Sequence, residues 1–121
     1  MARVTGPDFV ALQVRDLEAS GCFYEEWLGM GRAAHSPLGA VVFRSEPIPF
    51  TVREPAVDLD VVERLGWGVA LWLRCDDTQD LYDSLHASGV EIIQEPFDGP
   101  FGRTFSFVDP DGYVVTVHDG G

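Results

Sequence analysis

A short apolar motif occurs twice in this chain, 59 residues apart. Residues 10–15 read Val-Ala-Leu-Gln-Val-Arg, and residues 69–74 read Val-Ala-Leu-Trp-Leu-Arg. Each copy alternates as a strand does, and each is closely followed by an aspartate that suits the start of a helix. Self-similarity at a fixed offset indicates a duplicated structural module, and two copies are too few for a solenoid. The fold must therefore accommodate the same module twice.

The first copy predicts the order β, α, β, β. Asp16 stands where a helix needs its N-cap, and Gly29 or Gly31 suits the end of that helix. The predicted strands are residues 9–14, 40–44 and 48–53, with residues 32–35 as a further candidate. Pro49 has no N–H to give to a ladder, so it predicts an edge position or a bulge for its strand.

The second copy predicts the order β, α, β, β, β. Asp76 or Asp77 caps its helix, and Gly89 ends it. The predicted strands are residues 69–74, 90–94, 104–108 and 113–118. The last two form a hairpin, because Asp109 to Gly112 reads Asp-Pro-Asp-Gly, in which the first carboxylate caps a turn and the glycine accepts a positive φ.

These elements predict an α+β fold of two tandem βαβββ modules. The modules cover approximately residues 7–54 and 67–119, and residues 55–66 form a crossover that can include a short helical turn. The chain has 121 residues, which is enough for one domain with a real core and without disulfides.

The composition excludes some partners. Eight arginines, no lysine and twenty acidic residues give a net charge of −12, which repels nucleic acid. The negative charge attracts cationic small molecules, although an acidic composition is also explained by solubility alone. Cys22 and Cys75 lack the spacing of a metal site, so we expect free thiols in a reducing cytoplasm. No signal sequence or membrane-spanning stretch is found, and we expect no membrane association.

The order of elements and three local motifs carry a resemblance. The V-x-L-x-V strand, the FYxxxLG-like helix end and the F-x-D-P-D-G hairpin are similar to those of the vicinal oxygen chelate superfamily, which contains glyoxalase I, extradiol dioxygenases and the bleomycin-resistance proteins. The resemblance covers nearly the whole chain. It implies curved mixed sheets around a cleft, in chains of this length completed by a homodimer, but it does not fix the chemistry.

The metal-dependent members of that family hold a divalent ion at four equivalent positions. In this sequence those positions are Phe9, Thr51, Gly68 and Thr116. Phenylalanine and glycine have no donor, and threonine is a poor ligand beside carboxylate or imidazole. The three histidines show no HxH or HxxxH spacing. We therefore expect no metal, no other cofactor and no catalytic residues.

The cleft that the resemblance implies is aromatic in this sequence. Alternation places Phe9 and Gln13 on one strand face, Trp72 on its repeat, and Thr116 with His118 on the last strand. Trp67 flanks the Gly68 position. Aromatic side chains on strands often belong to the hydrophobic core. Here the opposite strand faces already carry the apolar residues that pack against the helices, so we expect the aromatic face to line a site for a flat ligand.

Within the superfamily the chain resembles the bleomycin-resistance type most. Residues 101–105, Phe-Gly-Arg-Thr-Phe, are similar to the W-G-R-E-F entry of its hairpin, and residues 71–74 are similar to its V-W-V-R strand. Its stacking aromatic then corresponds to Phe101, while a second one falls near Leu38, which is not aromatic. This departure argues against bleomycin itself and leaves another drug or natural product. Arg103 either contacts the ligand or pairs with Asp98.

The sequence thus predicts a metal-free cytoplasmic homodimer that confers resistance by sequestering a small molecule, with a cationic and planar one as the candidate. The expected ligand-binding residues are Phe9, Gln13, Leu38, Trp67, Trp72, Phe101, Arg103, Thr116 and His118. One alternative is a glyoxalase- or dioxygenase-like enzyme with a rearranged metal site, or an isomerase without metal. Another is a module that binds a protein partner and no small molecule.

Overall fold

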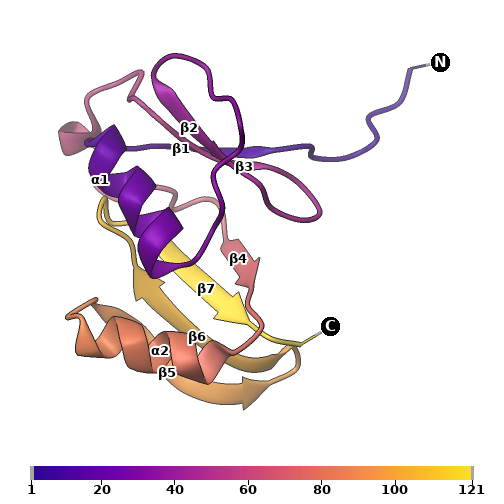
Figure 1. Ribbon diagram of the computed structural model, residues 1–121, viewed down its shortest axis with the longest axis vertical. Coiled ribbons are helices and arrows are strands. Elements are labelled where there is room, and N and C mark those ends of the chain that lie inside the picture. The colour runs from indigo at the N-terminus through magenta and orange to yellow at the C-terminus, as the bar shows by residue number, and fades with distance from the viewer. Residues whose placement is uncertain (1, 121) are drawn as a thin grey trace. The chain divides into compact units, whose positions relative to one another are not determined.

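The computed structural model describes residues 2–120, which divide into two compact units, residues 2–61 and residues 62–120 (Figure 1). The division falls inside the connection expected at residues 55–66. Each unit has its own small mixed sheet and its own helix, so the fold is α+β. Within residues 2–120, no helix is long and apolar enough to span a membrane.

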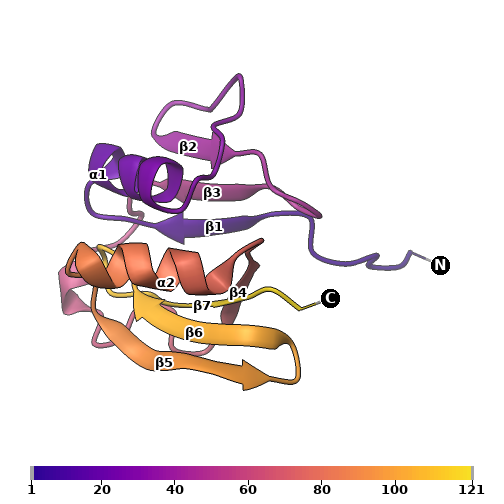
Figure 2. The ribbon, with the colours of Figure 1, turned by 60° about the horizontal axis from the view of Figure 1, so that its bottom comes forward.

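The first unit contains a three-stranded sheet. Its elements are β1 (Val10–Gln13), α1 (Leu17–Cys22), the π-helical turn η1 (Phe23–Trp27), β2 (Ala40–Phe43), β3 (Phe50–Arg53) and the 3-10 turn η2 (Leu59–Val61). The strand order is β1-β3-β2, with β1 parallel and β2 antiparallel to β3. α1 lies on one side of this sheet (Figure 2).

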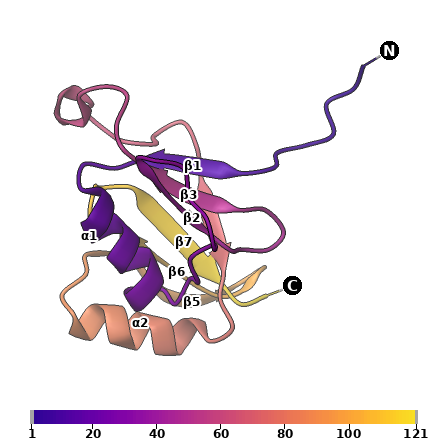
Figure 3. The ribbon, with the colours of Figure 1, turned by 45° about the horizontal axis from the view of Figure 1, so that its top comes forward.

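The second unit contains a four-stranded sheet. Its elements are β4 (Leu71–Arg74), α2 (Thr78–Ala87), β5 (Ile92–Gly99), β6 (Gly102–Val108) and β7 (Val114–His118). The order is β4-β7-β6-β5, with β4 parallel and β6 antiparallel to β7. α2 packs along β5 and β6 (Figure 3). The three strands β4, β7 and β6 repeat the order and directions of β1, β3 and β2, which is the topology expected of a duplicated module.

Both helices begin at the predicted aspartates. The Asp16 carboxylate accepts a hydrogen bond from the Ala19 N–H at 3.0 Å, and the Asp77 carboxylate accepts one from the Asp80 N–H at 3.1 Å. A side-chain acceptor at this position satisfies one of the donors that a helix start leaves unpaired. Gly89, with φ of +85°, ends α2 as predicted.

Several predicted boundaries are wrong in detail. The first helical segment does end at Gly29, which has φ of +75° after the C-cap Leu28, but its last turn is the π-helical η1 and not regular α-helix. The strand expected at residues 32–35 is reduced to one bridge between Arg32 and Phe43. β5 reaches Gly99, five residues beyond the predicted end. β4 begins only at Leu71, and Gly68 lies in the turn before it.

The edge position inferred from Pro49 is also wrong, because β3 is the central strand of its sheet. Pro49 lies just before β3, where no ladder donor is needed. Its carbonyl still accepts a hydrogen bond from the Val10 N–H at 3.1 Å. A proline at the entrance of a strand is thus compatible with a central strand.

One face of each sheet is the core. In the first unit Tyr24 packs on Phe50 and Phe43, with ring centroids 4.9 and 6.1 Å away. In the second unit Tyr82 of α2 meets Phe105 edge-on at 5.3 Å. Each fully buried Val, Leu or Phe contributes about 1.5–3 kcal/mol. The fully buried large side chains of the second unit are Leu85, Phe105, Phe107, Val115 and Val117.

The turn between β6 and β7 is built on Asp109, as predicted. Its buried carboxylate accepts hydrogen bonds from the backbone N–H groups of Asp111, Gly112 and Tyr113, at 2.9 to 3.0 Å. Gly112 has φ of +104°, a conformation that other residues resist. This turn fixes the register of β6 against β7.

Replacement of Asp109 tests this account of the turn. Asp109→Ala leaves three N–H groups without their acceptor, so we expect the free energy of unfolding to fall by about 3 kcal/mol, measured by urea denaturation. Asp109→Asn keeps a side-chain oxygen in place and should cost about 1 kcal/mol. Equal losses for the two variants would contradict the account.

Candidate functional site

Strand alternation gives the sheet of the second unit two unlike faces. Phe105, Phe107 and Val117 lie on the face that α2 covers. The other face carries Trp72 of β4 with Thr116 of β7, paired in register, and His118 two residues further along β7. We call this second face the Trp72 face. It is the surface on which the sequence predicted a site.

Three aromatic rings meet on the Trp72 face. The Phe101 ring stands edge-on to the Trp72 indole, with centroids 5.7 Å apart and planes at 77°. The His118 imidazole lies 5.8 Å from the indole and 6.2 Å from the Phe101 ring. Trp72 and Phe101 remain 46% and 51% exposed, so their free ring surfaces can contact a ligand. We call these three residues the aromatic cluster.

Phe101 is held in place by its own backbone. It lies in the two-residue loop that joins β5 to β6, and its carbonyl accepts hydrogen bonds from the Gly120 N–H at 2.7 Å and from His118 Nδ1 at 3.2 Å. The Gly120 carbonyl in turn accepts a hydrogen bond from the Arg74 guanidinium at 2.7 Å. The Asp119 carboxylate accepts one from the Arg103 N–H at 2.9 Å. Residues 119–120 thus clasp the loop that presents Phe101.

Two glycines allow this close approach. Gly102 has φ of +92°, and a Cβ there would lie 2.6 Å from the Gly120 nitrogen. A Cβ on Gly120 would lie 2.0 Å from the Phe101 carbonyl oxygen, a distance that the backbone cannot tolerate. The position of Phe101 therefore depends on glycine at both positions. A ring held in place in advance loses less entropy when a ligand binds.

A hydroxyl pair lies beside the aromatic cluster. Thr116 and Ser106 are cross-strand neighbours, and their hydroxyl oxygens are 2.7 Å apart. Since each hydroxyl both donates and accepts, the pair offers a small polar contact next to the Trp72 ring. Polar groups of this kind give orientation to a ligand that aromatic walls hold.

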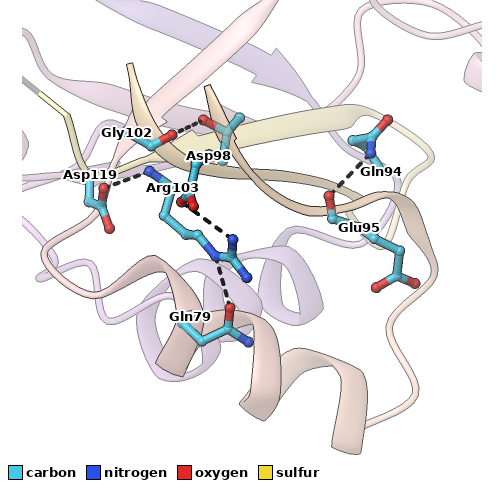
Figure 4. A network of polar contacts seen from close by, with 8 residues as sticks. Gln79, Gln94, Glu95, Asp98, Gly102, Arg103 and Asp119 are labelled. Atoms are coloured by element: carbon cyan, nitrogen blue, oxygen red, sulfur yellow. Dashed lines mark hydrogen bonds and ion pairs between the residues drawn. The ribbon is translucent and has the colours of Figure 1, made fainter. Parts of the chain in front are cut away.

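Arg103 lies on the opposite face. Its guanidinium donates to the Gln79 side chain on α2 at 3.1 Å and approaches the Asp98 carboxylate at 3.3 Å (Figure 4). Of the two roles considered for Arg103, the pairing with Asp98 is the one that the structure contains. Toward the clasp it contributes only its backbone N–H, which donates to the Asp119 carboxylate.

The other predicted site residues lie outside the cluster. Trp67 is in the turn before β4, where the Arg64 guanidinium lies 4.7 Å from its ring. Three more belong to the first unit: Phe9 is exposed ahead of β1, Leu38 is fully exposed in a turn, and the Gln13 side chain accepts a hydrogen bond from the Ala56 N–H at 2.6 Å. Their roles as ligand contacts stay predictions.

The four positions that hold a metal in metal-dependent relatives do not fit a divalent cation. Phe9 and Gly68 offer no donor, and the Thr116 hydroxyl is engaged with Ser106. Thr51 lies on β3 beside Ala11 of β1, its register partner, and alanine offers no second ligand there. Within residues 2–120, no three His, Cys, Asp or Glu side chains are grouped as metal ligands.

Cys75 adjoins the aromatic cluster through its backbone, because its N–H donates to the His118 carbonyl at 2.8 Å. Burial raises the pKa of the Cys75 thiol, and the nearby Asp76 and Asp77 carboxylates add to this effect, against backbone hydrogen bonds that lower it. The thiol is therefore protonated at neutral pH, which makes it a weak nucleophile.

On the far side of the sheet, the Tyr82 hydroxyl donates to the Glu95 carboxylate at 2.5 Å. This hydrogen bond is the main reason why the pKa of Tyr82 is raised. It stabilises the neutral phenol and occupies Glu95, so this carboxylate is directed toward α2.

Comparison with known proteins identifies the family. The profile of the Glyoxalase/Bleomycin resistance protein/Dioxygenase superfamily matches residues 6–117. This chain belongs to that superfamily. Comparison with curated proteins gave no match.

Solved structures with this superfamily fold include proteins with different descriptions. TnmS3 of Streptomyces sp. CB03234, described as an antibiotic binding protein, is 24% identical over the full length of both chains, with a TM-score of 0.72. UcmS2 is 25% identical over 99% of both chains, with a TM-score of 0.71. Lactoylglutathione lyase of Agrobacterium tumefaciens is 20% identical over 98% of this chain and 96% of that one, with a TM-score of 0.68.

The clasp was not predicted from the sequence. Arg74, Asp119 and Gly120 act on Phe101 through backbone groups, and hydrogen bonds to a backbone leave little trace in residue types. The glycine at position 102 was a usable signal, since glycine directly after a two-residue hairpin loop indicates a special backbone conformation.

Gly120→Ala tests the clasp. The added methyl group forces the Phe101 loop away, so we expect the near-ultraviolet circular dichroism of the Trp72–Phe101 pair to weaken while far-ultraviolet signal is retained. Gly68→Ala is the control, because a Cβ there meets no atom within 4 Å. Identical near-ultraviolet spectra for the two variants and the parent would contradict the clasp.

Proposed function

We propose that this protein binds a flat, aromatic antibiotic or natural product and confers resistance by sequestering it. The aromatic cluster is the observation that carries this proposal. Its Trp72 and Phe101 rings are half exposed, they stand at an angle to one another, and a backbone clasp holds Phe101. Ring stacking contributes about 0.5–1.5 kcal/mol beyond the burial of area, so a planar ligand that stacks on one of these rings and meets the other edge-on is retained.

The superfamily supports the proposal in part. TnmS3, which shares this fold along its whole length, is described as an antibiotic binding protein. At 24% identity that likeness extends to the fold alone, so the class of ligand is our inference from the aromatic cluster. The lactoylglutathione lyase shares the fold in the same sense. The residues at the four metal positions do not fit a divalent cation, so they give no support to lyase chemistry in this chain.

Tryptophan fluorescence tests the proposal directly. The chain has three tryptophans, so the double variant Trp27→Phe, Trp67→Phe leaves Trp72 as the single reporter. Titration of this variant with planar aromatic antibiotics, in a buffer with chelator, should give saturable quenching for at least one of them. Adding Phe101→Ala should then weaken binding about ten-fold, equivalent to about 1.4 kcal/mol of lost stacking and burial.

Ile93→Ala provides the matched control for Phe101→Ala. Ile93 is 52% exposed, close to the exposure of Phe101, but it lies on β5 and outside the aromatic cluster. We expect Ile93→Ala to bind the antibiotic with the same affinity as the parent protein. Unchanged affinity in Phe101→Ala would remove the proposed site. Binding or turnover that requires an added metal would favour the enzyme alternative.

A further inference from the structure

The acidic groups of the second unit are not distributed evenly over its sheet. The carboxylate of Glu95 accepts from Tyr82 on α2, and that of Asp98 pairs with Arg103. Asp119 is turned to the Arg103 N–H. All three carboxylates are therefore engaged by groups of the face that α2 covers or by the backbone. Figure 4 shows the contacts of Asp98 and Asp119 with Arg103. None of the strand positions that share the Trp72 face is acidic.

A positive charge does lie on the Trp72 face. Arg74 is the residue two positions after Trp72 on β4 and the register partner of His118 on β7. Its guanidinium is exposed and donates one hydrogen bond, to the Gly120 carbonyl at 2.7 Å. It forms no ion pair with any residue of the described range 2–120. A guanidinium has five N–H donors, so most of its capacity is available to a ligand.

The local charge outweighs the net charge in choosing a ligand. The overall charge of −12 attracts cations over long distances, but salt at physiological strength screens such forces beyond about 8 Å. Trp72 and Arg74 are two residues apart on one face of β4, so their Cα atoms are about 6.6 Å apart, within that range. A fixed fork of donors also matches a carboxylate in geometry, which a diffuse field does not.

We infer that the aromatic cluster takes an aromatic acid, with the ring against Trp72 and Phe101 and an ionised carboxylate or phenolate at the Arg74 guanidinium. This inference rests on the proposed function and specifies its ligand. It differs from the cationic ligand that composition alone favours, because composition does not show on which face the charges lie.

A matched pair of probes tests the inference. Anthraquinone-2-carboxylate and anthraquinone-2-carboxamide share one planar ring system and differ in charge. We expect the parent protein to bind the carboxylate about five-fold more tightly than the amide, the usual scale of a partly exposed ion pair. In Arg74→Gln this preference should fall to about one. Arg64→Gln removes the same charge beside Trp67 and should keep the preference.

The amide probe distinguishes a direct contact of Arg74 with the ligand from its role in the clasp. If Arg74→Gln weakens both probes equally, with the preference for the carboxylate retained, Arg74 acts only on the clasp through Gly120, and the inference is overturned. Equal binding of both probes by the parent also overturns it, and the proposed function stands if Phe101→Ala still weakens the amide. If the parent binds neither probe at millimolar concentration, the inference is overturned, and the proposed function is decided separately by the antibiotic titration of the Trp72 reporter variant.

Discussion

The alternation of side chains along β4, β6 and β7 is the constraint on which the rest of this structure depends. Because successive residues face opposite sides, the same three strands supply a core to α2 and a separate aromatic surface. Phe105 and Val117 are fully buried, while Trp72 and His118 keep part of their surface free. A shift of one residue in register would exchange the two faces and destroy both.

Two turns hold that register and the site with it. At one end of the β6–β7 ladder, the Asp109 carboxylate gathers three backbone N–H groups. At the other end, residues 119–120 bind the loop that carries Phe101. The aromatic cluster thus lies at the end of the ladder that the clasp holds, and the same hydrogen bonds fix the β5–β6 loop and place the Phe101 ring.

Features that depend on residues close together in the chain could be predicted from the sequence. The caps at Asp16 and Asp77, the Asp109 turn and the strand pattern around Trp72 all depend on residues close together in the chain, and the structure confirms them. The repeat at an offset of 59 residues predicted the shared topology of the two sheets.

The sequence was a poor guide wherever tertiary contacts decide the outcome. It indicated an edge strand from Pro49, but the proline lies just outside a central one. Two roles stayed open for Arg103. Strand alternation places its side chain beside α2 only once the register of β6 against its neighbouring strand is known. No role was predicted for Arg74 for the same reason, although it is the last residue of the motif that contains Trp72.

The central claim is that the Trp72 face of the second unit binds the ligand without a metal. An NMR titration of isotope-labelled protein with a planar aromatic acid, in the presence of chelator, tests it most directly. The account predicts that the largest shifts occur at the Trp72 indole N–H, the Phe101 ring and the His118 imidazole, and that Trp67 changes little. Largest shifts at Trp67 or Leu38, or shifts that appear only after a divalent metal is added, would contradict it.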